Sequence, residues 1–207
     1  MRLRNSVTMP RPLPPGPTQP FAGQLGEITP IAGVKDTFFS ETMPLPFDLH
    51  AFRVEDRIGL FLTDNARLAP GTYPPPDGGV VTVFPFAELR SRDRPAFRLV
   101  VKRSHYGRPR FPFVEIDSPG TPWYGRVWLL FSCMYQREPY NLALVSYLQL
   151  APAGRSRMTC RQAYVWSSAH VECVEVALFR RTVVVVSSYL NPPGVTERRR
   201  LMHIVKS

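Results

Sequence analysis

The densest group of side chains able to do chemistry lies between positions 90 and 110. This segment contains eight basic residues and a single acid, Asp93. The basic residues are Arg90, Arg92, Arg94, Arg98, Lys102, Arg103, Arg108 and Arg110. Guanidinium groups bind phosphates bidentately and stack on bases, and interleaved aromatic residues such as Phe97 and Tyr106 add surface for stacking. The segment therefore predicts a nucleic-acid-binding surface, with an acidic protein surface as the alternative partner. A solvated pair of strands that protects a sheet edge is the other interpretation.

Two carboxylates follow this segment on a short alternating run. Glu115 and Asp117 project from one face of the same predicted strand, as metal-dependent nucleases require of their ligands. A third ligand is missing from the pattern, because Glu172 and Glu175 stand in no diagnostic context. No two His or Cys residues are spaced as zinc ligands, and no phosphate-binding glycine loop is present. We predict no metal site and no cofactor.

Nucleophilic catalysis has one candidate pair, His170 and Cys173, which lie close together in the sequence. No G-x-S-x-G elbow or other catalytic motif surrounds them, and we expect a strand-end histidine and a buried thiol instead. Cys133, Cys160 and Cys173 form neither a disulfide framework nor a zinc motif, which indicates free thiols in a reducing intracellular compartment. We predict no catalytic residues and a protein that is not an enzyme.

The cations must be positioned by strands, because apolar residues alternate with them. Phe97, Leu99 and Val101 can pack on one face while Arg98, Val100 and Lys102 point outward. We therefore expect the basic side chains to gather on one exposed wall of the sheet. Further runs of aromatic and β-branched residues predict strands. They are Val80–Phe84, Phe113–Ile116, Gly125–Phe131, Leu142–Leu148, Ala163–Trp166, His170–Val176, Thr182–Val186 and Leu201–Val205.

Helices are few in this pattern. Phe47–Leu62 is the best helix candidate, although a strand ending at Leu62 fits almost as well, and Phe86–Leu89 makes at most one helical turn. The chain has 207 residues, of which 44% are hydrophobic and 23 are proline, so it can bury a core but has many interrupted segments. Short strands at close spacing predict a mostly-β fold, a small antiparallel barrel or sandwich.

Proline dominates the start of the chain, with six prolines between positions 10 and 20. This density excludes the amphipathic helix of a transit peptide. We predict a largely disordered Pro-rich tail over residues 1–45 and a β-rich binding domain over residues 46–207, with its core at 95–207. No apolar stretch reaches the roughly 20 residues needed to cross a bilayer, so no membrane partner is expected. The formal net charge of +10 favours a polyanionic partner.

Three runs carry a resemblance to a known family: Ser104–Ile116 (SHYGRPRFPFVEI), Trp123–Phe131 (WYGRVWLLF) and Leu142–Tyr147 (LALVSY). They resemble the C-terminal β-domain of CACTA-like DNA transposon proteins of green algae, fungi and oomycetes. The layout is also similar to bromo-adjacent-homology barrels, which read chromatin. The resemblance covers residues 95–207 and departs from the family pattern at Pro112 and Phe113. The family's catalytic residues would lie in an upstream domain, so none is carried over.

Together these observations favour a transposon-derived, non-catalytic domain that binds DNA or chromatin in the nucleus through its Arg-rich face. An alternative is a structural or assembly protein, such as a viral coat, tegument or organellar-ribosome component. Its Pro-rich arm would contact a neighbouring subunit, and its basic face would contact packaged nucleic acid. The sequence leaves the oligomeric state open.

Overall fold

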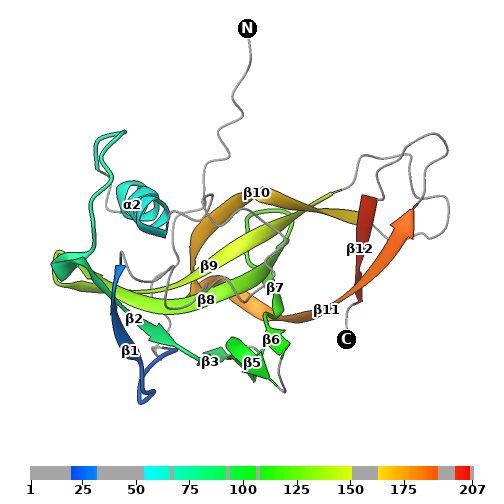
Figure 1. The fold of residues 1–207 in the computed structure, drawn as a ribbon, viewed down its shortest axis with the longest axis horizontal. Coiled ribbons are helices and arrows are strands. Elements are labelled where there is room, and N and C mark those ends of the chain that lie inside the picture. Colours follow the sequence, from blue (N-terminus) through cyan, green and yellow to red (C-terminus); the bar gives the residue numbers. More distant parts are fainter. Residues whose placement is uncertain are drawn as a thin grey trace, which may run out of the picture.

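Antiparallel β-structure makes up most of the protein (Figure 1). The structure, a computed structural model, describes residues 20–31, 54–65, 68–91, 94–105, 108–150, 163–190 and 199–205. These residues contain twelve strands, one α-helix and two short 3-10 helices. The predicted mostly-β, antiparallel fold with few helices is confirmed. No helix in the described ranges has the length and apolarity needed to cross a membrane.

The main sheet contains eight strands in the order β1-β2-β8-β7-β11-β12-β10-β9. Their bounds are β1 Glu27–Pro30, β2 Val80–Phe84, β7 Phe113–Ile116, β8 Trp123–Tyr135, β9 Glu138–Leu150, β10 Ala163–Glu175, β11 Phe179–Leu190 and β12 Arg199–Val205. An additional pairing joins β8 to β9, so the sheet bends back on itself. The register of the β9–β10 pairing shifts between Trp166 and Val171, so the sheet is irregular there. Of the two predicted layouts, the bent sandwich-like sheet fits better than the barrel.

The long central strands β8 and β9 hold the core. Trp128, Leu130 and Phe131 on β8 pack with Leu142 and Leu144 on β9, and all five are almost completely buried. An apolar run of this kind, without polar alternation, is typical of a strand covered on both faces. At Gly125 the two strands approach so closely that a Cβ would overlap Val145 Cγ1. The sequence pattern predicted both strands, and the structure extends them beyond the predicted ends.

Helix α2 (Val54–Asn65) lies against β10 and covers part of the sheet (Figure 1). Ile58 and Leu62, one helical turn apart, are fully buried, which accounts for the amphipathic pattern. The helix prediction is therefore confirmed over Val54–Leu62 and the alternative strand is wrong. The predicted start at Phe47 lies outside the described residues.

Part of the predicted N-terminal tail belongs to the fold. The ring of Phe21 stacks on Phe84 with centroids 4.2 Å apart, and β1 pairs with β2. The prediction of a disordered tail is thus wrong for residues 20–31, because an aromatic contact and a strand pairing hold this segment. Residues 1–19 and 32–45 of the predicted tail lie outside the described residues.

Two small hairpins precede β7. One pairs β3 (Phe86–Ser91) with β4 (Arg94–Val100), and the other pairs β5 (Lys102–His105) with β6 (Arg108–Arg110). The single helical turn predicted for Phe86–Leu89 is wrong. Cross-strand pairing to β4 and the hydrogen bond from Val101 N to Pro85 O (2.9 Å) hold this segment extended.

Candidate nucleic-acid interface

The β3–β4 hairpin is a ribbon with two chemically different faces. Ala87 and Leu99 are directly opposite each other and fully buried, so one face joins the core. Leu89 and Phe97 form the next pair on this face and are half-buried against the same core. The predicted alternation of Phe97, Leu99 and Val101 is confirmed, because all three pack inward while Arg98 is exposed. We call the opposite face, made of Phe86, Glu88, Arg90, Arg98 and Val100, the outer ribbon face.

On the outer ribbon face Arg98 is held by an aromatic ring. Its guanidinium carbon lies 3.9 Å from the centroid of the Phe86 ring, a cation–π contact between diagonal neighbours of the hairpin. Stacking of this kind orients a planar guanidinium and leaves its N–H edge available to a ligand. Phe86 is a residue that sequence reasoning missed. Strand-like alternation of Phe86, Glu88 and Arg90 would have revealed it.

Glu88 is the acid of this face. It stands directly opposite Arg98 in the β3–β4 register, and its carboxylate lies 3.9 Å from the Arg90 guanidinium. The side chains of Arg90 and Glu88 are 68% and 48% exposed. A long ion pair between exposed groups contributes little stability, since water and salt screen it. Both groups therefore remain free to exchange partners.

The eight predicted cations divide between two hairpins. Arg90 and Arg94 lie on β3 and β4 with Arg98, whereas Lys102, Arg103, Arg108 and Arg110 lie on β5 and β6. Lys102 pairs with Arg110 across the second hairpin. Arg92 lies outside the described residues. We expected these cations on one wall of the sheet, but the described ones lie on two separate two-stranded hairpins, which Val101 joins in sequence.

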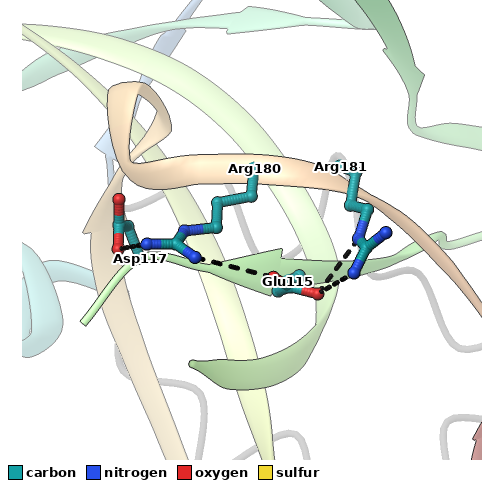
Figure 2. A network of polar contacts seen from close by, with 4 residues as sticks. All are labelled: Glu115, Asp117, Arg180 and Arg181. Atoms are coloured by element: carbon teal, nitrogen blue, oxygen red, sulfur yellow. Dashed lines mark hydrogen bonds and ion pairs between the residues drawn. The ribbon is translucent and has the colours of Figure 1, made fainter. Parts of the chain in front are cut away.

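The two carboxylates considered as metal ligands are occupied by arginines instead (Figure 2). Glu115 is 5% exposed, and its Oε2 accepts hydrogen bonds from Nε and Nη2 of Arg181 at 3.0 and 2.9 Å. Arg180 bridges the two acids: its Nη1 lies 3.9 Å from Glu115 Oε1, and its Nη2 donates to Asp117 Oδ1. The arrangement neutralises both carboxylates at the β7–β11 pairing.

Tyr124 extends this network to β8. It stands opposite Glu115 in the β7–β8 register, and burial together with the Glu115 carboxylate raises its pKa. Glu115 is therefore surrounded by donors from both neighbouring strands. Within the described ranges no cluster of three or more His, Cys, Asp or Glu side chains has the arrangement of a metal site. Arg180 and Arg181 are partners that the sequence pattern did not reveal.

The thiols have the properties of core residues. Cys133 and Cys173 are buried and free of disulfide bonds. Burial raises the pKa of Cys133 to about 12, and it also raises the pKa of Cys173. A catalytic thiol needs a lowered pKa, so the environment of Cys173 opposes the nucleophilic role considered for it with His170. Cys160 lies outside the described residues.

Comparison with known proteins adds no family to this geometry. No protein-family model matches the chain, and no curated protein matches it in sequence.

Proposed function

We propose that this protein is a non-catalytic binding module that contacts DNA or chromatin through the β3–β4 and β5–β6 hairpins. The observation that carries the proposal is the stacked, exposed guanidinium of Arg98 on a ribbon whose opposite face is buried in the core. A rigid ribbon presents its cations at low entropic cost, and phosphates attract such cations through counterion release. The excess of basic over acidic residues between positions 90 and 110 supports the same partner.

A nuclear location and an origin in a transposon belong to the proposal as well. They rest on the resemblance of Ser104–Ile116, Trp123–Phe131 and Leu142–Tyr147 to the β-domain of CACTA-like transposon proteins. These runs correspond to the segment from β5 through β9. The resemblance to chromatin-reading barrels favours a reader of packaged DNA over an enzyme.

Salt dependence of binding tests the proposal. The full chain is titrated against a labelled DNA duplex by fluorescence anisotropy at salt concentrations from about 50 to about 200 mM. Affinity should fall steeply with salt, and each neutralised phosphate contact should reduce the slope of log K against log salt by about 0.9. The test variant replaces five cations by Gln at once: Arg98, Lys102, Arg103, Arg108 and Arg110.

The matched control is Arg137→Asn, which removes an exposed charge at the turn between β8 and β9. Asn suits the positive φ of 67° found there. Arg137→Asn should leave the slope unchanged, whereas the five-residue variant should flatten it by as much as about 4.5. Binding that ignores salt, or an absence of binding at low salt, overturns the proposal.

A second candidate is the assembly protein, and one observation favours it. Val184 and Val186, which alternate along β11, are 57% and 50% exposed. Two exposed valines on the same face of a strand suit contact with another protein surface. The mass of the protein in solution separates the candidates: a large stable assembly supports the second, and a monomer that binds DNA supports the first.

A further inference from the structure

We propose that the β3–β4 ribbon enters the major groove of duplex DNA and that Arg98 and Glu88 together read a G·C pair there. The inference rests on the proposed function and names the substrate that this face would select. A two-stranded ribbon fits the major groove, which is about 12 Å wide. The burial of Ala87 and Leu99 anchors one face to the protein and leaves the outer ribbon face to meet the bases.

Arg98 supplies the hydrogen-bond donors that would contact the guanine. Its guanidinium lies over the Phe86 ring at 3.9 Å, so its orientation is restricted before any ligand arrives. A preorganised guanidinium fork matches the O6 and N7 acceptors of guanine, the most frequent specific contact in the major groove. Phe86 acts through Arg98 and is a positioning residue.

Glu88 supplies the hydrogen-bond acceptor that would contact the cytosine. The β3–β4 register places it directly opposite Arg98, at the separation of a cross-strand pair. Cytosine presents an N4 amino donor to the major groove beside the guanine acceptors, and carboxylates accept from this group. An A·T pair reverses this order, because the adenine N6 donor stands where guanine offers its O6 acceptor and the thymine O4 acceptor stands where cytosine offers its donor, so both Arg98 and Glu88 would face the wrong group. The same negative charge repels phosphates, so Glu88 lowers affinity for DNA in general while it raises selectivity.

The experiment compares two duplexes of equal length, one of G·C pairs and one of A·T pairs, with the full chain. Wild type should prefer the G·C duplex by between about 5-fold and about 100-fold, the discrimination of a bidentate contact. Arg98→Lys keeps the charge but loses the bidentate fork, so affinity for the A·T duplex should persist and the preference for the G·C duplex should shrink. Phe86→Leu should reduce the preference without changing the salt slope, which a loss of folded protein would not do.

Glu88→Ala should act in the opposite direction on affinity. It should tighten binding to both duplexes and reduce the ratio of the affinity for the G·C duplex to the affinity for the A·T duplex. Asp64→Asn is its matched control, because this exposed acid lies on α2 and its loss should leave the ratio unchanged. Thermal unfolding of each variant checks that the fold is intact.

The binding results distinguish a failure of this inference from a failure of the proposed function. Equal affinity of wild type for the two duplexes, or an unchanged preference in Arg98→Lys, overturns the inference and leaves the proposed function standing. Stronger binding to a single strand than to either duplex has the same meaning. An absence of binding to any DNA overturns both.

Discussion

Replacing Glu115 by Gln should destabilise the native state, because this carboxylate is the centre of the network in Figure 2. Gln keeps the shape of the side chain but removes the charge that Arg180 and Arg181 share. Two charge-assisted hydrogen bonds from Arg181, at 3.0 and 2.9 Å, would be weakened. The guanidiniums would remain at the β7–β11 pairing without their main counter-charge.

The size of the loss follows from burial. Breaking a fully buried ion pair costs about 3–5 kcal/mol. The side chains of Arg180 and Arg181 are 34% and 40% exposed, so water can replace part of the lost interaction. We therefore expect a loss near the lower end, about 3 kcal/mol. With an m-value of about 2 kcal/mol/M, the urea midpoint should fall by about 1.5 M.

Urea unfolding at neutral pH, followed by tryptophan fluorescence and by circular dichroism, measures this change. Asp117→Asn is the graded control. The Asp117 side chain is 27% exposed and interacts with Arg180, so its loss should cost about 1 kcal/mol. A midpoint for Glu115→Gln within experimental error of wild type would refute the reasoning. A larger loss for Asp117→Asn than for Glu115→Gln would refute it as well.

Two further predictions concern the sheet. Gly125→Ala should destabilise the protein by about 3 kcal/mol, since the new Cβ would overlap Val145 Cγ1 and lie 3.1 Å from the Ser146 carbonyl oxygen; a wild-type melting temperature would contradict this. Burial raises the pKa of Glu175, so the native state keeps a proton that the unfolded chain has already lost. Stability should fall as pH rises from the ordinary pKa of glutamate through the raised one. Glu175→Gln should therefore stabilise the protein at neutral pH but not in acid, and equal gains at both would disprove the coupling.

The strands were predictable where a single physical pattern decides them. Val127–Phe131 is an unbroken apolar run, and Phe97, Leu99 and Val101 alternate with Arg98 and Val100, which are less buried than Leu99. Both patterns depend only on local sequence, because burial on one face or two faces fixes the side-chain period. The structure reproduces both.

Other features depend on partners distant in sequence. Phe86–Leu89 follows a proline and contains good helix formers, yet it pairs with β4 as a strand. Phe21 stacks on the ring of Phe84, which lies far along the chain. Arg181 and Glu115 are 66 residues apart. Local propensity and spacing contain no signal for such contacts.

Location, more than net charge, determines what each arginine can do. Arg180 and Arg181 are neutralised by Glu115 and Asp117 at a strand pairing, so this cluster adds nothing to the formal net charge and its arginines contribute to folding. Arg98 is exposed and stacked on Phe86, and its acidic neighbour Glu88 is solvated. A ligand can therefore compete for Arg98 at low cost, whereas competing for Arg181 would strip a buried carboxylate of its partner. The formal net charge of +10 therefore does not say which arginines are available to a ligand, whereas the contacts of each guanidinium do.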